Sequence, residues 1–508
     1  MTNFKLLPPI FRLASRRRFL RGLCSVVLGS SASAVLAPIQ GLARPASQAA
    51  VKALRAALEG TVVSASDENY EIHRLGLVWQ MLKPRRYPAM IVQAASKADV
   101  IRTVKFARQQ NYQVSIRSGG HNYVSSYLAD GTLVLDIRHL QGIEVDPVQR
   151  TARIGPAVYG STLTKELEKH GFSFPVPHPG KIPMGGYLLG GGQGWNGQAW
   201  GGAACLNIEE VEVVTAEGCL VTANKQQNTD LYWAARGAGP CFFGVVTSFT
   251  LKLYDEPGTV LRSTYTWPVK DAVEVSAWAY KKAMEMPSYV ETWFFFVAAP
   301  RTDTDNGHVT NTDSVCIVQS CAFASNEAAA RAALAPLTQA DEALEGKCLD
   351  KHEYENTSIT ALQDETDTVS LPWHHAVDNM WTDHPPQAYT AELIEHMAKM
   401  PSDLSAIVCV LKPHDEQRPG DHLPMLGKTY FLCFNVWTDP EQTQANIEWR
   451  DQTMVLVEPY GKGHYISEAN FLARPSRAEN SFTEGSWQKL RTLRDKYDPG
   501  HLFYTQLD

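Results

Sequence analysis

The chain lacks the basic excess that a protein binding nucleic acid needs. Its 47 Lys and Arg residues are outnumbered by 54 Asp and Glu residues, which leaves a formal net charge of −7 over 508 residues. Polyanions and anionic membranes are attracted to basic stripes and patches, and an acidic chain repels them. We therefore expect no nucleic-acid partner.

Ordered cysteine motifs are also lacking. None of the nine cysteines stands in a CxxC or zinc-ligand spacing. Cys316 and Cys321 lie an odd number of residues apart on an expected strand, so they should face opposite sides and not pair. Most of the cysteines are expected to be small buried residues, although one or two disulfides remain compatible with an oxidising compartment. We expect no metal site.

No apolar run reaches the roughly 20 residues that a transmembrane helix needs, so stable membrane insertion is not expected. Residues 1–43 hold Lys5 and five arginines but no acidic residue. The sequence Ser15-Arg16-Arg17-Arg18-Phe19-Leu20-Arg21 precedes a short apolar run and then small residues, which is typical of a twin-arginine signal peptide. This pattern predicts a partnership with the Tat translocase and a periplasmic or secreted protein.

The most informative stretch is Arg117-Ser118-Gly119-Gly120-His121. Tyr112, Val114 and Ile116 alternate with polar residues before it, which predicts a strand. Side chains almost vanish at Ser-Gly-Gly, so backbone N–H groups could surround an anion such as a pyrophosphate. An imidazole follows at once. Most isolated Gly-Gly-His triplets are only a tight turn followed by a surface histidine, so this one needs support from the rest of the chain.

A second glycine-rich segment spans residues 184–202. It contains a formal G-x-G-x-x-G at Gly192, Gly194 and Gly197. That dinucleotide-binding fingerprint must open a helix directly after a strand, and the sequence that follows has no helical apolar period. We interpret the segment as a second wall that allows close approach of backbone to a flat or phosphorylated ligand.

Hydrophobic periodicity predicts alternating short helices and strands up to about residue 254. Residues 49–83 have a helical pattern, residues 97–110 and 161–171 are expected helices, and Ser161 is the expected cap of the latter. Strands are expected at 89–96, 133–137 and 143–155, the last as a hairpin. Further strands are expected at 291–299, 315–324, 404–412 and 429–438, with helices at 326–337 and 390–400.

Three motifs occur in order: RSGGH, the GG…GGG segment, and DLYWAARGAG followed by FGVVTSF. In this the chain resembles the FAD-linked oxidoreductases of the vanillyl-alcohol-oxidase superfamily, and most closely the berberine-bridge-enzyme-like, oxygen-dependent branch. The resemblance implies an α+β fold: a two-part, PCMH-type FAD-binding domain with an inserted substrate domain of antiparallel sheet and helices. The implied boundaries are a signal at 1–43, a helical lead-in at 44–83, the FAD-binding domain at 84–255, the substrate domain at 256–455 and a returning tail at 456–508.

The resemblance also implies which residues hold the cofactor. His121 stands where the family forms a covalent bond to FAD, and a covalent bond would prevent loss of the cofactor after export. The other residues implied to contact FAD are Arg117, Ser118, Gly119, Gly120, Ile182, Gly185, Gly186, Gly190, Gly191, Gly192, Gly244, Val245 and Val246. Members with two links have a cysteine where this chain has Pro177-His178-Pro179-Gly180, so a single link is expected and His178 is read as a satisfied loop residue. Ile182 aligns with a position that controls access of oxygen.

Candidate catalytic residues lie in the tail and on a strand of the substrate domain. Glu468 stands where many relatives have a tyrosine base, and a half-buried carboxylate there would have a raised pKa suited to accepting a hydroxyl proton. Tyr465 and Tyr430 are the other candidates. For Glu468, a purely structural role as a hydrogen-bond anchor of the tail is the alternative. Asn435 and Trp437 on the same strand also alternate with apolar residues and are candidates for contacts with the substrate, with ordinary packing an equal alternative.

These features predict an exported flavoenzyme that oxidises a C–H bond of an alcohol, sugar or hydroxylated heterocycle, with dioxygen or another acceptor reoxidising the cofactor. A flavin-dependent cyclase or isomerase and a non-catalytic binding protein are the alternatives. We expect the three histidines His374, His375 and His384 to be solvated loop residues.

Overall fold

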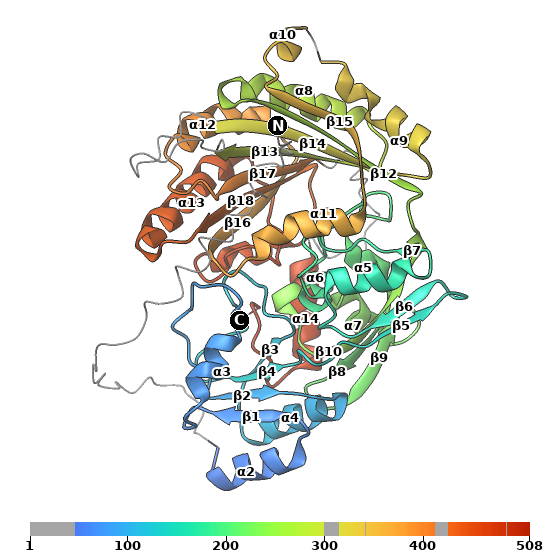
Figure 1. Ribbon diagram of the computed structural model, residues 1–508. Helices are drawn as coiled ribbons and strands as arrows, with labels where there is room; N and C mark the ends of the chain where they lie inside the picture. Colours follow the sequence, from blue (N-terminus) through green and yellow to red (C-terminus); the bar gives the residue numbers. More distant parts are fainter. Residues whose placement is uncertain (1–45, 299–313, 341, 412–424, 484, 508) are drawn as a thin grey trace, which may run out of the picture.

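The structure, a computed structural model, describes residues 46–298, 314–340, 342–411, 425–483 and 485–507. Two lobes are stacked on each other, one built on small sheets and the other on a single large sheet (Figure 1). The signal peptide expected over 1–43 lies outside the described residues. Within the described ranges, none of the helices combines the length and the apolar character required to cross a bilayer.

The first sheet has the strand order β1-β2-β4-β3. Its strands are β1 (Thr61–Ser64), β2 (Met90–Gln93), β3 (Val114–Arg117) and β4 (Leu133–Asp136). Strands β2, β3 and β4 are parallel, and β1 is antiparallel to β2. Helices α2 (Gln48–Ala57), α3 (Tyr70–Gly76) and α4 (Lys97–Gln109) accompany this sheet.

The continuous helical pattern expected over 49–83 is wrong, because β1 interrupts it. Val62 and Val63 are both buried, and β-branched side chains favour a pleated surface. A Cβ on Gly60 would lie 2.0 Å from the carbonyl oxygen of Gln93. Only glycine allows this close approach of the two backbones at the start of the strand.

The second sheet is an antiparallel array in the order β5-β6-β10-β8-β9. Its strands are β5 (Ile143–Asp146), β6 (Thr151–Ile154), β8 (Ile208–Val214), β9 (Leu220–Asn224) and β10 (Val245–Lys252), and a small pair joins β7 (Phe172–Ser173) to β11 (Tyr254–Asp255). The hairpin expected at 143–155 is confirmed. Helices α5 (Gly160–Glu168), α6 (Met184–Leu189) and α7 (Thr229–Ala234) lie beside this sheet. The expected cap at Ser161 is wrong, since α5 begins one residue earlier and its cap position is Tyr159.

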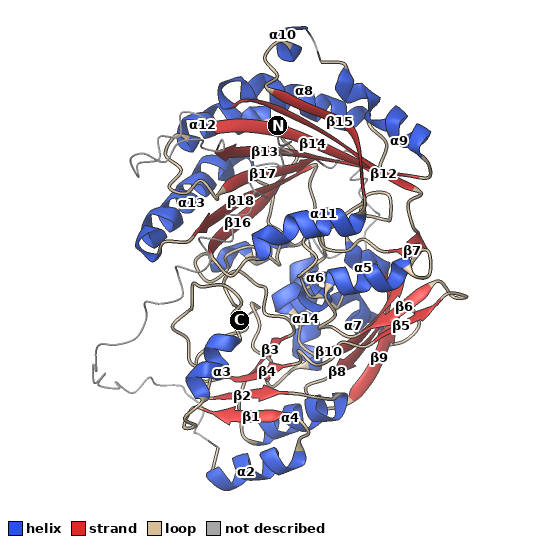
Figure 2. Ribbon diagram, viewed as in Figure 1, coloured by secondary structure: helices blue, strands red, loops and turns tan. Residues whose placement is uncertain are grey.

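The other lobe is a seven-stranded antiparallel sheet in the order β15-β12-β14-β13-β17-β18-β16, with its outer face covered by helices (Figure 2). The strands are β12 (Thr259–Pro268), β13 (Val290–Ala298), β14 (Ser314–Ala324), β15 (Asp350–Thr357), β16 (His374–Thr382), β17 (Ala406–Leu411) and β18 (Thr429–Trp437). The helices on the outer face are α8 (Ala272–Glu285), α9 (Glu327–Leu334), α10 (Glu342–Glu345), α12 (Gln387–Met397) and α13 (Thr443–Val457), whereas α11 (Ile359–Thr366) lies on the inner side, next to α5.

Both faces of this sheet are buried, which explains its nearly continuous apolar strands. Along β13, Phe294 and Phe296 belong to the core beneath the outer helices, whereas Trp293 and Phe295 belong to the core shared with the lobe built on small sheets. Each buried aromatic side chain contributes on the order of 2–3 kcal/mol to folding. The sheet therefore binds the two lobes together.

Cys316 and Cys321 lie on opposite faces of β14, as predicted. Both are free thiols.

The tail returns to the first sheet, as the order of motifs predicted. After α14 (Ser486–Tyr497), the chain runs beside β3: Val114 N–H donates to the carbonyl of Leu502 at 2.7 Å, and Tyr504 N–H donates to the carbonyl of Val114 at 2.9 Å. Because β3 leads straight into the RSGGH loop, the tail is held against that loop.

Candidate functional site

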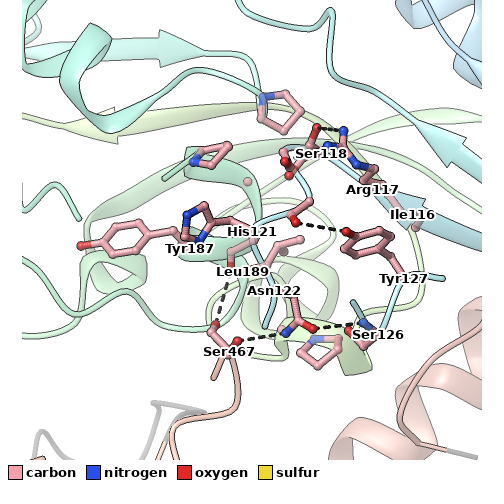
Figure 3. Close-up of a pocket in the computed structure, with 18 of the residues that line it drawn as sticks. Ile116, Arg117, Ser118, His121, Asn122, Ser126, Tyr127, Tyr187, Leu189 and Ser467 are labelled. Atoms are coloured by element: carbon pink, nitrogen blue, oxygen red, sulfur yellow. Dashed lines mark hydrogen bonds between the residues drawn. The ribbon is translucent and has the colours of Figure 1, made fainter. Parts of the chain in front are cut away.

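A cavity of about 210 Å³ lies where the loop after β3, helix α6 and the tail meet (Figure 3). The predicted residues that line it are Arg117, Ser118, Gly119, Gly120, His121, Ile182, Gly185, Gly186, Gly244, Val246, Tyr465 and Glu468. Segments more than 300 residues apart in sequence thus form one site.

The side chain of Arg117 stabilises the conformation of the RSGGH loop by hydrogen bonds. Its guanidinium donates to Asp136 Oδ1 at 3.0 Å, to the carbonyl of Leu77 at 2.8 Å and to that of Gly119 at 2.9 Å. Gly120 has a φ of +72°, and a Cβ there would lie 2.5 Å from Arg117 Nε. The second glycine is therefore required by the backbone conformation and by the guanidinium packed against it.

His121 presents an unengaged nitrogen inside the protein. Its ring stacks on Trp79 with centroids 4.1 Å apart, and Nε2 is buried without a hydrogen-bond partner among the described residues. Burial, aided by neighbouring His375, lowers the pKa of His121 to about 3. The imidazole is consequently neutral at any physiological pH, with a lone pair available on an oriented ring.

Helix α6 forms the second glycine wall, and its residues line the cavity as far as Leu189, but the glycines that follow the helix do not. Gly186 faces open space, where a Cβ would meet no atom within 4 Å, while a Cβ on Gly185 would lie 2.8 Å from Ser118 Oγ. The three glycines 190–192 lie outside the set of residues that line the cavity. Gly190 instead accommodates Ser467, whose Oγ would be 1.7 Å from an added Cβ.

At the start of strand β10, the predicted residues likewise divide into some that line the cavity and one that does not. Gly244 and Val246 line the cavity, whereas Val245 is packed into the core of the first sheet. Successive strand residues point to opposite faces, so Val245 cannot share the side of its neighbours.

The residues present fit an FAD molecule. The end of β3, the RSGGH loop, helix α6 and the tail all line the cavity, and its walls include open backbone at Gly186 and the imidazole of His121, whose Nε2 has no partner among the described residues. A diphosphate needs close backbone N–H groups, and a flat ring system needs slots without side chains.

A second cavity of about 110 Å³ opens between the lobe built on small sheets and the inner face of the large sheet. Five residues line both cavities: Tyr123, Ile182, Tyr187, Tyr465 and Glu468. These residues mark the place where the two spaces meet.

Glu468 is a partly buried carboxyl at this junction. Tyr430 from β18 donates its hydroxyl to Glu468 Oε2. Burial raises the pKa of Glu468 to about 7, and the hydrogen bond from Tyr430 opposes that rise. Tyr465 packs edge-on against Tyr430, and its hydroxyl oxygen accepts from Gly192 N–H at 3.2 Å. Burial raises the pKa of both tyrosines, so Glu468 alone of the three titrates near neutral pH.

Two expectations about β18 and β16 are wrong. Asn435 and Trp437 occupy the face of β18 opposite to that of Tyr430, because they differ from it by an odd number of residues. His374 and His375 are buried in β16 and are not solvated loop residues. Strand periodicity was hidden there because both faces of β16 are covered. His384 is exposed, as expected.

His178 is satisfied, as expected, by an ionisable partner. Its Nε2 lies 2.6 Å from Glu291 Oε1, and Trp293 Nε1 donates to the same oxygen at 2.6 Å. No group of three or more His, Cys, Asp or Glu side chains suited to a metal ion occurs in the described parts of the chain.

Sequence reasoning missed several lining residues. Asn122, directly after His121, donates from Nδ2 to the carbonyl of Ser467 at 3.1 Å and so connects the loop to the tail (Figure 3). Tyr123 and Tyr504 also line the cavity. Asn122 and Tyr123 directly follow His121 in sequence, and this adjacency could have predicted that they line the cavity. No sequence pattern could have predicted that Trp79 stacks on His121.

Comparison with known proteins agrees with this site. Residues 88–224 match a family described as an FAD binding domain. The FAD-linked oxidoreductase nodO of Hypoxylon pulicicidum is 26% identical over 432 residues, covering 82% of this chain and 90% of the relative. The (R)-6-hydroxynicotine oxidase of Paenarthrobacter nicotinovorans is 33% identical over 210 residues, covering 41% of this chain and 45% of the relative.

Solved structures share the whole fold. The 6-hydroxy-D-nicotine oxidase from Arthrobacter nicotinovorans superposes with a TM-score of 0.76 at 20% identity, covering 89% of this chain and 98% of that structure. The BBE-like 1 protein of Physcomitrella patens has the same TM-score at 19% identity, with coverages of 90% and 99%. The predicted α+β fold and the FAD cofactor are confirmed, and the matches support the resemblance to the vanillyl-alcohol-oxidase superfamily.

Proposed function

From the premise that this chain is an FAD-dependent oxidoreductase, we propose that it holds FAD through a single covalent bond to His121 and oxidises a substrate C–H bond with Glu468 as base. The substrate is an alcohol, a sugar or a hydroxylated heterocycle. The observation that carries the proposal is the position of Glu468: a partly buried carboxyl, with a pKa raised to about 7, where the two cavities meet.

His121 supplies the attachment. A neutral imidazole with an unpaired, buried Nε2 can act as a nucleophile, and stacking on Trp79 keeps the ring from rotating away. Backbone groups of Gly119, Gly120 and Gly186 would hold the diphosphate. The absence of cysteine at 177–180 supports one bond rather than two.

FAD held in the first cavity would supply the acceptor for the hydride that leaves the substrate carbon, and dioxygen or another acceptor would restore the oxidised cofactor. Glu468 accepts the proton released from the substrate hydroxyl or amine, so that an alcohol becomes a carbonyl and the charges balance. A base with a pKa near the working pH performs this transfer most efficiently, and general base catalysis of this kind contributes about 10²- to 10⁴-fold in rate.

Tyr430 holds the carboxylate by its hydrogen bond, and Ile182 lies on the border of both cavities, where it could limit the approach of oxygen. Export by the Tat translocase to the periplasm or medium is part of the same proposal. It is supported by the residue pattern of the segment 1–43.

The attachment is tested by acid denaturation of the purified protein. Yellow colour should remain with the precipitated chain near one flavin per chain, and the peptide containing His121 should carry the extra mass. His121→Ala should release the flavin on denaturation, whereas His139→Ala, which changes an exposed histidine, should not. A colourless wild-type precipitate would contradict covalent attachment. Comparing hydrogen peroxide production with dye reduction then separates an oxidase from a dehydrogenase.

A further inference from the structure

The edge strand of the large sheet, β16, is extended by the tail. Trp381 N–H donates to the carbonyl of Gly463 at 2.7 Å, and Lys462 N–H donates to the carbonyl of Trp381 at 2.8 Å. On its other side, Trp381 is paired in register with Tyr430 of β18, and the centroids of the two rings lie 4.9 Å apart. One residue of β16 thus aligns both the tail and Tyr430.

Beyond this bridge, the side chain of Asn379 continues the hydrogen bonding between β16 and the tail. Its Oδ1 accepts from the N–H of Tyr465 at 2.7 Å, and its Nδ2 donates to the carbonyl of Tyr465 at 3.2 Å. Because a main-chain N–H can only donate, this pair of contacts fixes the orientation of the amide. Asn379 is fully buried, and its own carbonyl accepts from His464 Nδ1 at 2.6 Å. The amide therefore holds both main-chain groups of Tyr465.

The residue held in this way begins the turn that carries Glu468. Glu468 N–H donates at 3.1 Å to the carbonyl of Tyr465, the same oxygen that accepts from Asn379. From the other lobe, Asn122 donates to the carbonyl of Ser467. One asparagine of each lobe thus fixes the turn, and Glu468 extends from it to the junction of the two cavities.

We propose that Asn379 is a positioning residue: by fixing the turn of the tail, it holds the carboxyl of Glu468 against the hydroxyl of Tyr430. The inference rests on the proposed function, in which Glu468 is the base. Asn379 belongs to neither set of cavity-lining residues, so it acts through the turn and not by contact with a ligand. Asn379 and Trp381 share one face of β16. This one strand therefore places both partners of the hydrogen bond.

Tyrosines surround Glu468 at the junction, and they leave its charge dependent on one bond. Tyr123, Tyr430 and Tyr465 line the same space, and burial raises the pKa of each, so none is ionised near pH 7. The pKa of Glu468 is raised by burial and lowered by the bond from Tyr430. Loss of that bond should therefore raise the pKa of Glu468 further. Apart from tyrosines, the other ionisable residues that line the two cavities are Arg117, His121 and His178.

The test replaces Asn379 by threonine in the flavin-loaded protein. Threonine has a similar volume and suits a strand, but its single hydroxyl cannot bond both main-chain groups of Tyr465. The measurement is the pH titration of the Glu468 carboxyl by infrared difference spectroscopy, with Glu468→Gln identifying the band. The midpoint should rise by about one pH unit in Asn379→Thr, which is an about tenfold weaker ionisation.

Two comparisons separate positioning from a general loss of packing. In a Tyr430→Phe background, Asn379→Thr should change the ionisation constant by less than about twofold, because the bond it protects is already absent. Asn446→Thr changes another fully buried asparagine, whose Nδ2 donates to the carbonyl of Gln442 at 3.0 Å in α13. It should leave the midpoint where it is. Thermal melting and flavin content show that each variant is folded, and Asn379→Ala takes the place of Asn379→Thr if the latter does not fold.

An unchanged or lowered midpoint in Asn379→Thr overturns the inference, as does an equal shift in the Tyr430→Phe background or in Asn446→Thr. Failure of both Asn379 variants to fold assigns the residue to the core alone and likewise overturns it. The titration needs no substrate, so the inference and the proposed function can fail separately. If the midpoint shifts as expected but the pH profile of flavin reduction does not follow it, Asn379 still positions Glu468, and the result counts against Glu468 as the base.

Discussion

Replacing Tyr430 by phenylalanine isolates the electrostatics of the proposed base. The hydroxyl of Tyr430 donates to Glu468 and lowers a pKa that burial has raised to about 7. A hydrogen bond to a charged group contributes about 1.5–3 kcal/mol, and about 1.4 kcal/mol corresponds to one pH unit. Loss of the donor should therefore raise the pKa of Glu468 by about one to two pH units.

The midpoint of the acidic limb in the pH profile of flavin reduction reports this pKa. It should lie near pH 7 in the wild-type protein and move upward in Tyr430→Phe, while the rate at high pH changes less. Infrared difference spectra between pH 5 and 9 follow the protonated carboxyl directly, and Glu468→Gln identifies the band. The matched control is Tyr389→Phe, which removes a buried hydroxyl on the other face of the sheet. An unchanged or lowered midpoint in Tyr430→Phe would refute the reasoning.

Two further predictions concern stability and cofactor loading. The folded-state pKa of Glu468 is raised from 4.5 to about 7, so stability present below pH 4.5 is lost as pH rises toward 7, by about 3 kcal/mol at most. Glu468→Gln should consequently melt at a higher temperature than wild type at pH 8 but not at pH 4.5, as measured by calorimetry. Equal melting curves of the two proteins at pH 8 would contradict a destabilising charge on Glu468. Gly186→Val places a side chain in the open space of the first cavity and should abolish flavin incorporation in a folded protein. Gly142→Val, at an exposed loop with similar free space, should load normally, and full loading of Gly186→Val would show that the flavin lies elsewhere.

Local patterns were sufficient wherever function depends on backbone shape or on residues close in sequence. The RSGGH loop was recognisable because glycine and histidine follow an alternating strand, and β3 ends at Arg117 as expected. The tail residue Glu468 was identified from its motif, and the structure places it beside the first cavity.

Predictions failed where several residues in a row look equivalent. Val245 and the glycines 190–192 share motifs with lining residues but point into the protein or pack against it. The sequence predicts a loop position for His375, but this residue lies in strand β16. Its ring packs against Trp79, and Trp79 in turn stacks on His121.

The sequence by itself determined the cofactor class and the acidic character of the chain, because these depend on residue types and on motifs of short spacing. Only the tertiary structure decided that Glu468 packs against Tyr430 with a pKa near 7 and that the ring of Trp79 stacks on His121. Burial and partner choice arise when segments hundreds of residues apart pack together, and no local pattern records that contact.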